Sequence, residues 1–508
     1  MLSDLAAFFV PGAEKAAFGR FTLAAEGRPP AETGPAIRRR MRIVRVRGKK
    51  GQAGMAKIAI VGAGCAGLAA AAALVDQKSI PVTVTLFDAS GRMGGRAQTS
   101  IDPPGLPVDL GPQFIQDPDV NPWTAIAKKL GFNLVQVSMN GVYRIYQEKI
   151  WRNAFTTQGI SAMNDQLDEQ YQNALKFKNA PIIAGGAPAE YKGQQDIRLA
   201  LGSSYLGSIA ESAEPWQYVA RDRDRQESVD GGANMYVEGG LGTLVEAYGN
   251  ALCSHNESRL AFAPSTIVDG IEARDDGVSL HTADGRLLDF DFCIVTIPCA
   301  EVEKIDFAPP LPGKRVRADE YIRLGSYKKV AFRPTAFPPA DSQDPSESNS
   351  IEQGQEYYIY DADRDGTWQY FRLPTDPTIL ICVTSGDFAR ALDGQADNDV
   401  AKSVMKLLGK SYPKGDFAPA DDKIVVTNWT NAPYVHGAYS YTHYGPELEP
   451  DNPIPYKARK KIGKPCGRIH FAGEATWIKA YGTIHGAYYS GDRAAEEVLK
   501  AIRLANKK

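Results

Sequence analysis

The residues able to do chemistry begin with a G-x-G-x-x-G motif made by Gly62, Gly64 and Gly67. The motif stands between the apolar run 57–61 and an alanine-rich stretch of strong helical propensity. Its glycines permit a tight turn, let the backbone approach a pyrophosphate, and let helix and strand pack closely. Asp88 ends a second β-branched run about 20 residues later, where a carboxylate can accept hydrogen bonds from a ribose. This strand-helix-strand pattern predicts a dinucleotide site, although it does not distinguish FAD from NAD.

The segment 88–96, D-A-S-G-R-M-G-G-R, resembles the second fingerprint of the flavin-containing amine oxidase family, in which a glutamate precedes R-x-G-G-R. The resemblance implies that Gly94 and Gly95 bring backbone beside the pyrophosphate of FAD and that Arg96 adds a guanidinium donor. Asp88 replaces the commoner glutamate, which shortens its reach but keeps the acceptor. FAD is therefore the expected cofactor.

The resemblance continues, in the order of the family, through nearly everything after residue 55. The matching segments are 108–115 (V-D-L-G-P-Q-F-I), 239–244 (G-G-L-G-T-L), 266–268 (T-I-V), 295–298 (V-T-I-P), 309–312 (P-P-L-P), 471–476 (F-A-G-E-A-T) and 481–487 (Y-G-T-I-H-G-A). The family likeness implies that Glu474 receives a hydroxyl of the flavin chain. It also implies that the Ile484 N–H, at the start of the final helix, faces the flavin's pyrimidine carbonyl.

The resemblance assigns FAD contacts along the whole chain. The implied residues are Gly62, Ala63, Gly64, Ala66, Gly67, Asp88, Ala89, Gly94, Gly95, Arg96, Gly111, Pro112, Gln113, Phe114, Val268, Gly473, Glu474, Thr483 and Ile484.

The run 324–330, L-G-S-Y-K-K-V, resembles the family strand whose lysine holds a water molecule against flavin N5. Spacing aligns Lys329, and not Lys328, with that lysine. The alternative is an ordinary lysine at a strand edge, although lysines are rarely buried without a task. Lys329 is therefore a candidate catalytic residue.

Aromatic residues near the C-terminus are candidates for the substrate site. Trp429 precedes the segment 437–441, G-A-Y-S-Y, and Tyr439 takes the place of one wall of the family's aromatic cage. Ala438 stands where a cysteine of monoamine oxidases bonds covalently to the flavin, so noncovalent FAD is expected. The alternative for Tyr439 is a core tyrosine.

Three further positions bear on the substrate. The other cage wall corresponds to Thr483, as in vertebrate-type polyamine oxidases, and Asn121 followed by proline also favours that branch. However, Gln116 replaces the histidine or glutamate that those enzymes direct at the amine, and a neutral amide cannot balance a second cationic centre. Amino-acid oxidases of the family usually carry an arginine where Phe114 stands here. An amine is therefore expected over an amino acid.

The expected function is a FAD-dependent amine oxidase that passes a hydride from the carbon next to the amine to flavin N5. Dioxygen then yields hydrogen peroxide, and the imine hydrolyses to an aldehyde. The alternatives are an L-amino-acid oxidase of the same family, a desaturase or porphyrinogen-type flavin enzyme, and a catalytically idle flavoprotein that serves as a binding module.

The expected fold is α/β, with a Rossmann-like FAD-binding domain and a substrate domain of mixed β-sheet and helices. Strands are expected at 57–61, 82–87, 278–282 and 287–297, with an amphipathic helix at 492–505. The FAD-binding domain is expected at 55–122, 231–330 and 429–508, and the substrate domain at 123–230 and 331–428. Residues 1–54, which contain an arginine-rich stretch, are expected to form a basic, disordered extension.

Composition excludes several classes of partner. The 508 residues carry a formal net charge of −2, which gives no long-range field for nucleic acid or anionic membranes. The six cysteines are scattered without a C-x-x-C pair, which favours reduced thiols in a cytoplasm and no metal site. No apolar run is long enough to span a bilayer. The oligomeric state is not predicted.

Overall fold

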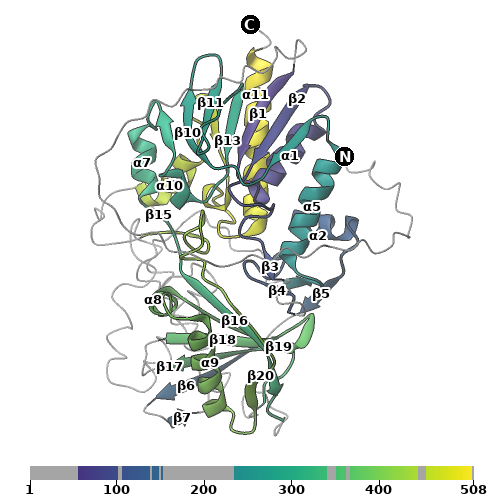
Figure 1. Ribbon diagram of the computed structural model, residues 1–508, viewed down its shortest axis with the longest axis vertical. Coiled ribbons are helices and arrows are strands. Elements are labelled where there is room, and N and C mark those ends of the chain that lie inside the picture. Colours follow the sequence, from purple (N-terminus) through teal and green to yellow (C-terminus); the bar gives the residue numbers. More distant parts are fainter. Residues whose placement is uncertain are drawn as a thin grey trace. The chain divides into compact units, whose positions relative to one another are not determined.

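The computed structural model describes residues 55–100, 106–137, 140–147, 150–152, 234–339, 350–361, 366–443 and 454–505 (Figure 1). The basic extension expected at 1–54 lies outside the described residues. Most of the first expected substrate segment, 123–230, lies outside them too. Within the described part, the structure is the expected α/β fold with a second, mixed sheet.

A five-stranded parallel sheet carries the first glycine motif, and its strand order is β22-β13-β1-β2-β9. Its central strand β1 reads A-K-I-A-I-V and ends in four buried residues, as befits a strand covered on both faces. The strands come from both ends and the middle of the chain. They are β1 (Ala56–Val61), β2 (Val82–Phe87), β9 (Leu260–Ala263), β13 (Phe292–Val295) and β22 (Ile469–Phe471).

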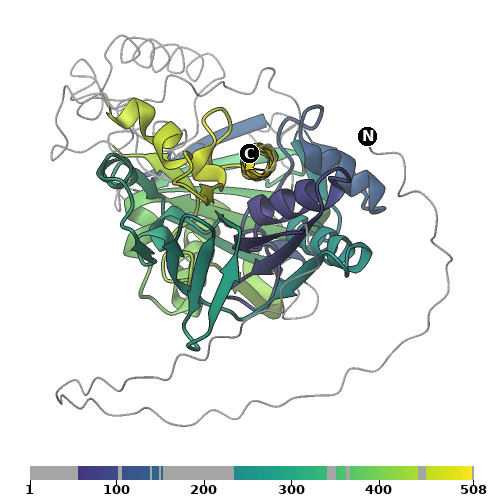
Figure 2. The same ribbon diagram turned by 90° about the horizontal axis from the view of Figure 1, so that it is seen from above.

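Two helices, α1 (Cys65–Asp76) and α11 (Ile484–Ala505), join this sheet in one hydrophobic core. Figure 2 shows α11 end-on, in yellow, beside the purple α1. A Cβ added to Gly491 of α11 would lie 2.1 Å from the carbonyl oxygen of Ala66 in α1. Only a glycine therefore lets the two helices approach this closely.

The single strand expected at 287–297 is in fact two strands in different sheets. β12 (Leu287–Phe290) ends a four-stranded sheet of order β12-β11-β10-β14, whereas β13 joins the parallel sheet. The break falls at Asp291, whose carboxylate accepts the Lys57 N–H at 2.7 Å and so ties the bend to β1. The other members are β10 (Val268–Ala273), β11 (Val278–Thr282) and β14 (Asp306–Ala308).

A seven-stranded mixed sheet of order β20-β16-β19-β18-β17-β6-β7 belongs to the second part of the fold. One face packs in a core with α9 (Asp397–Ser411), and α8 (Gly386–Ala391) precedes that helix. The opposite face forms a separate core with Val108 and Tyr236. The strands are β6 (Asn140–Gln147), β7 (Ile150–Arg152), β16 (Tyr327–Ala336), β17 (Gln355–Asp361), β18 (Gly366–Leu373), β19 (Asp376–Ser385) and β20 (Asp416–Val426).

Short elements connect these sheets. Three two-stranded pairs are β3 (Thr99–Ser100) with β4 (Val108–Asp109), β5 (Leu134–Val137) with β8 (Asn234–Val237), and β15 (Ile322–Leu324) with β21 (Ser440–Thr442). The remaining helices are α2 (Pro122–Lys129), α5 (Leu241–His255), α6 (Cys299–Val302), α7 (Gly313–Asp319) and α10 (Ile454–Ile462), with a 3₁₀ turn at Glu474–Thr476.

Two features shift the expected domain boundaries. Trp123 and Ala127 of α2 are buried in the core of the parallel sheet, so that core continues beyond residue 122. β16 begins at Tyr327, so the seven-stranded sheet starts before residue 331.

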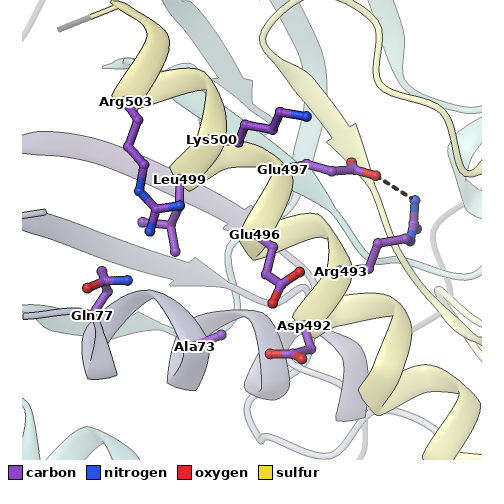
Figure 3. Close-up of a pocket in the computed structure, with 9 residues that line it drawn as sticks. All are labelled: Ala73, Gln77, Asp492, Arg493, Glu496, Glu497, Leu499, Lys500 and Arg503. Atoms are coloured by element: carbon purple, nitrogen blue, oxygen red, sulfur yellow. Dashed lines mark hydrogen bonds and ion pairs between the residues drawn. The ribbon is translucent and has the colours of Figure 1, made fainter. Parts of the chain in front are cut away.

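A charged groove follows the outer side of α1 and α11 (Figure 3). Ala73 and Leu499 contribute apolar surface, and Arg493 and Glu497 form an ion pair of 3.1 Å across its rim. None of the candidate cofactor or substrate residues lines it. No helix in the described part of the chain is long and apolar enough to cross a membrane.

Candidate active site

The first glycine turn connects the end of β1 to α1. Gly62 has a φ of 111°, which is a conformation that favours glycine, and its N–H donates to the Phe87 carbonyl at 2.8 Å. A Cβ on Gly67 would lie 1.9 Å from the Gly62 carbonyl oxygen. The motif therefore brings the N-terminal N–H groups of α1 to the ends of β1 and β2.

The second glycine turn lies directly against the first. The Gly94 N–H donates to the Ala63 carbonyl at 2.8 Å, and Gly64 and Gly94 form an isolated parallel bridge. Gly95 has a φ of 57°, and a Cβ there would approach the Gly64 Cα to 3.2 Å. The two motifs that the sequence linked by resemblance are thus in direct contact.

Asp88 braces the first turn. One of its oxygens accepts the Ala63 N–H at 2.7 Å, and the other accepts the Ser90 N–H at 2.8 Å and the Ser90 hydroxyl at 2.6 Å. Asp88 is half-buried, and its contact with a ribose hydroxyl stays a prediction. The neighbouring Ala89 continues this loop.

Arg92 was not singled out in the sequence, yet it organises the second turn. Its Nη1 donates to the carbonyls of Met93 and Ala97, at 3.1 and 3.2 Å, and its Nη2 donates to the Gln98 side chain at 2.8 Å. Nη2 also donates to the Gly95 carbonyl at 2.5 Å. The first arginine of R-x-G-G-R was the available signal, because a planar guanidinium can bind several carbonyls at once.

Arg96 and Glu474 join segments from the two ends of the chain. Arg96 Nη1 donates to Glu474 Oε1 at 2.9 Å and to the Ala438 carbonyl at 2.7 Å. Glu474 also accepts the Ser440 hydroxyl at 2.6 Å and the Gly482 N–H at 2.8 Å. Burial alone would raise the pKa of Glu474, but Arg96 and these donors hold it below its ordinary value. Glu474 is therefore buried and ionised, and it holds together the segments that carry Arg96, Ser440 and Gly482.

Lys329 is completely buried on β16. Its ammonium donates to the backbone carbonyl of Asp109, and also to that of Gly111 at 3.3 Å. Burial lowers the pKa of Lys329 to about 8, while the charge of Asp109 opposes this shift. Lys328 lies on the other face of the strand and forms an ion pair of 2.8 Å with Asp393. Because successive side chains of β16 point to opposite faces, Lys329, and not Lys328, points toward the 108–115 turn.

Asp109 is a second residue that the sequence reasoning missed. Its oxygens accept the N–H groups of Leu241 and Gly242, at 2.9 and 3.0 Å, and the Thr99 hydroxyl at 2.6 Å. It therefore caps the N-terminus of α5, where a carboxylate is favoured by the helix dipole. Burial nevertheless raises the pKa of Asp109 above its ordinary value, against the effect of these donors and of Lys329.

The candidate substrate aromatics occupy different environments. Tyr439 is half-buried, with its ring centroid 6.4 Å from that of Tyr327, and it packs closely on Gly482. Trp429 is 7% exposed, and its Nε1 donates to the Leu110 carbonyl at 2.9 Å. Part of Tyr439 therefore remains exposed and its contact with substrate stays a prediction, whereas Trp429 supports the turn that precedes Gly111.

The other two predicted substrate contacts, Thr483 and Gln116, form hydrogen bonds within the protein. The Thr483 hydroxyl accepts the Gly486 N–H at 3.0 Å and donates to the Ala480 carbonyl at 2.7 Å, so it caps α11. The Gln116 carbonyl accepts the Asn121 amide at 2.7 Å, which leaves the Gln116 side chain out of that contact.

The remaining predicted cofactor contacts are spread over three segments. Phe114, two residues after Pro112, packs against Tyr236 with ring centroids 5.6 Å apart. Val268 opens β10, and the Gly473 N–H donates to the Ser490 hydroxyl at 2.8 Å, which joins the turn before Glu474 to α11.

The sequence of residues 65–499 matches the family described as flavin containing amine oxidoreductase. The chain belongs to this family. The match begins within the first glycine motif and includes Arg96, Lys329 and Glu474. The protein is therefore a FAD-dependent amine oxidoreductase, as the motifs had indicated.

Individual relatives agree with this assignment. The chain is 24% identical over 463 residues to the probable polyamine oxidase 4 of Arabidopsis thaliana, covering 85% of each chain. It is 24% identical over 467 residues to the lysine-specific histone demethylase 1B of Mus musculus, covering 85% of this chain but 52% of that protein. Among solved structures, the cyclohexylamine oxidase from Brevibacterium oxydans IH-35A has the same fold, with a TM-score of 0.67 at 19% identity, covering 88% of this chain and 99% of that one.

Two observations in this flavin-dependent oxidoreductase fit the cofactor. Outside its chain neighbours, the nearest protein atom to a Cβ on Gly64 would be the Gly95 Cα, at 3.9 Å, so the two glycine turns leave a cradle that a side chain would fill. The Gln113 Nε2 atom is buried and has no hydrogen-bond partner among the described residues, at the turn where the flavin is expected. A buried amide without a partner is costly, and a flavin heteroatom could accept from it.

Proposed function

We propose that this oxidoreductase oxidises a small-molecule amine at the carbon next to nitrogen and uses dioxygen as the final acceptor, so that an aldehyde and hydrogen peroxide form. The observation that carries the proposal is the buried Lys329 ammonium, directed at the 109–111 backbone beside the candidate FAD cradle. The names of the relatives, a polyamine oxidase and a cyclohexylamine oxidase, support an amine as the substrate.

The glycine turns, Asp88, Arg96 and Glu474 are the groups that would hold FAD. When bound, FAD supplies the oxidising power, because it accepts a hydride from the amine and returns the electrons to dioxygen. Ala438 offers no thiol for a covalent bond, so the cofactor is held noncovalently. Arg96 Nη1 serves Glu474 and Ala438, whereas its Nε and Nη2 groups form no hydrogen bond with the residues that the structure describes and can donate to the pyrophosphate.

Tyr439 and Lys329 have separate tasks in this proposal. The half-buried ring of Tyr439 binds the substrate in its neutral form, since only an unprotonated amine has the lone pair that stabilises the departing hydride's carbon. Lys329 orients a water molecule and, below a pH of about 8, supplies a positive charge close to the site of dioxygen reduction. The imine product then hydrolyses in water to an aldehyde and ammonia or a smaller amine.

An amine is favoured over an amino acid because the described part of the site shows no clamp for a carboxylate. Phe114 occupies the position at which an arginine clamp was considered, and it packs against Tyr236. The nearby Arg96 is engaged with Glu474. A substrate carboxylate would therefore lose its hydration without gaining a bidentate partner.

A substrate panel with two readouts tests this function. We expect oxygen consumption, matched by hydrogen peroxide and aldehyde, with one or more primary or secondary amines, and little with L-amino acids. Rapid turnover of amino acids with release of 2-oxo acids would contradict the proposal and favour an L-amino-acid oxidase. Desaturation of an apolar substrate without aldehyde formation would favour the desaturase alternative.

A further inference from the structure

The seven-stranded sheet carries a carboxylate, Glu356, that is not among the predicted site residues. Glu356 belongs to β17, in which Tyr357 and Ile359 are completely buried in the core that contains α9. Successive side chains of a strand point to opposite faces, so Glu356 and Tyr358 lie on the other face.

The register of the sheet connects this face to Lys329. Tyr358 pairs with Gln369 of β18, Gln369 pairs with Val383 of β19, and Val383 pairs with Lys329 of β16. Directly paired residues point to the same face, so one row of side chains leads from Lys329 to Tyr358. Glu356 lies on the same face of β17, two residues before Tyr358, which ends that row.

The partners of Glu356 are neutral. Its Oε2 accepts the Tyr358 hydroxyl at 2.6 Å, and Gln369 Nε2 donates to the same hydroxyl at 3.1 Å. Among the residues that the structure describes, no lysine, arginine or histidine forms an ion pair with Glu356. Burial raises the pKa of Glu356 above its ordinary value, and its hydrogen bonds oppose this shift.

Glu356 also acts on the aromatics of the candidate substrate region. Burial, and after it the charge of Glu356, raises the pKa of the Tyr236 and Tyr327 phenols. Tyr327 packs near Tyr439, and Tyr236 packs on Phe114. The carboxyl therefore shares its surroundings with the groups that flank the proposed amine site.

A half-buried carboxylate with no cationic partner among the described residues is unfavourable, and the binding of a cation would offset its desolvation. We propose that Glu356 binds a second, protonated nitrogen of the substrate, so that diamines or polyamines are preferred over monoamines. This inference rests on the proposed amine oxidase function. It supplies the negative charge that the neutral Gln116 cannot provide.

The sheet also limits the length of the substrate. β16 and β17 are separated by three strand spacings, or about 14 Å, because β19 and β18 lie between them. The lengths of the Lys329 and Glu356 side chains can take up part of that span. We therefore expect the two nitrogens of the best substrate to be on the order of 10 Å apart.

Paired substrates test the inference. In the wild-type holoenzyme, 1,8-diaminooctane should have a kcat/KM roughly 10- to 100-fold above that of octylamine, as expected for a hydrogen bond to a charged group. Glu356→Gln should reduce this ratio to near one. Glu352→Gln, which changes a nearby carboxylate that accepts the Ser350 hydroxyl at 2.8 Å, should leave the ratio as in the wild type. A ratio near one in the wild type, or one that Glu356→Gln does not change, would overturn the inference.

Binding of quaternary ammonium ions provides a readout without turnover. By calorimetry, octane-1,8-bis(trimethylammonium) should bind the wild type more tightly than octyltrimethylammonium does, and this difference should shrink in Glu356→Gln. Equal binding of the two ions by the wild type would refute the role of Glu356, even if octylamine is oxidised. If no amine supported oxygen consumption, that result would instead contradict the proposed amine oxidase function.

Discussion

At the scale of single residues, the site depends on charges held away from water. Lys329 is buried with backbone carbonyls as its partners, and Asp109 is buried between donors at the start of α5. Glu474 is buried with Arg96. Each charged group has partners that partly replace its lost hydration. Substitutions at these positions should therefore change the protonation state of the site more than they change the fold.

Lys329→Met should slow amine turnover by about 10²-fold or more, because the positioned ammonium and its water are lost. The wild-type rate should also change with an ionisation near pH 8, the value to which burial lowers the pKa of Lys329. This ionisation should be absent from the variant. Steady-state pH profiles of both proteins, each with its FAD content measured, provide the test. Near-normal turnover with FAD bound would remove Lys329 from the mechanism.

His485 should make the fold sensitive to acid. Burial lowers the pKa of His485 to about 4 from an ordinary value of 6.5, so the folded state keeps the ring neutral where the unfolded state protonates it. The associated stability is present above pH 6.5 and is lost as the pH falls toward 4, and it amounts to about 3 kcal/mol.

Urea denaturation at pH 7 and pH 4.5 measures this effect. Wild type should lose more stability than His485→Gln over that interval, because glutamine does not titrate. Equal losses in the two proteins would show that other groups cause the acid sensitivity. The Asn121 amide, 3.3 Å from His485 Nδ1, can hydrogen-bond glutamine too, which makes this substitution conservative.

At the scale of elements, two contacts between glycine and backbone hold the FAD-binding part together. One joins the turn at Gly62 to α1, and the other joins α1 to α11. The second contact holds α11 against α1. Just before α11 begins, the Gly482 N–H donates to the Glu474 carboxylate. The geometry of the site therefore depends on close helix packing at a distance from it.

Gly491→Ala should destabilise the protein by about 1–3 kcal/mol, because its Cβ would lie 2.1 Å from the Ala66 carbonyl oxygen. Gly409→Ala is a matched control in helix α9, where an added Cβ meets nothing within 4 Å. This control should be neutral or up to about 1 kcal/mol more stable. Thermal unfolding of the two variants distinguishes them, and equal midpoints would contradict the packing argument.

The sequence predicted elements best where local signals were strong. The β1-α1-β2 unit was predicted because an apolar run, a glycine motif and an alanine-rich helix follow one another. The division of 287–297 between two sheets was not predicted, because Asp291 becomes a breakpoint only through its bond to the distant Lys57. The same reason explains why Asp109 was missed, because its partners Leu241 and Gly242 are distant in the sequence.

At the scale of the whole molecule, the candidate cofactor site joins segments that are far apart in the chain. Gly64, Arg96 and Glu474 belong to three such segments, and ion pairs and backbone bonds bring them together. A ligand that contacts all three stabilises the folded state because it binds that state alone. The resemblance in the sequence could predict this grouping, whereas single motifs could not.

Cofactor removal should lower the thermal midpoint, and restoring FAD should recover it. Saturation at about 1,000 times the dissociation constant corresponds to about 4 kcal/mol. Because Ala438 has no thiol, acid precipitation should release all the FAD into the supernatant. Yellow colour that remains in the precipitate would show a covalent bond and contradict the noncovalent assignment.

The central claim is tested most directly by mixing the purified holoenzyme with amines in the absence of oxygen and following the flavin absorbance near its visible maximum. We expect rapid bleaching with an amine and a much lower bleaching rate in Lys329→Met or Tyr439→Ala. Admitting oxygen should restore the yellow colour and produce hydrogen peroxide. A folded, FAD-loaded protein that no amine bleaches would contradict this claim.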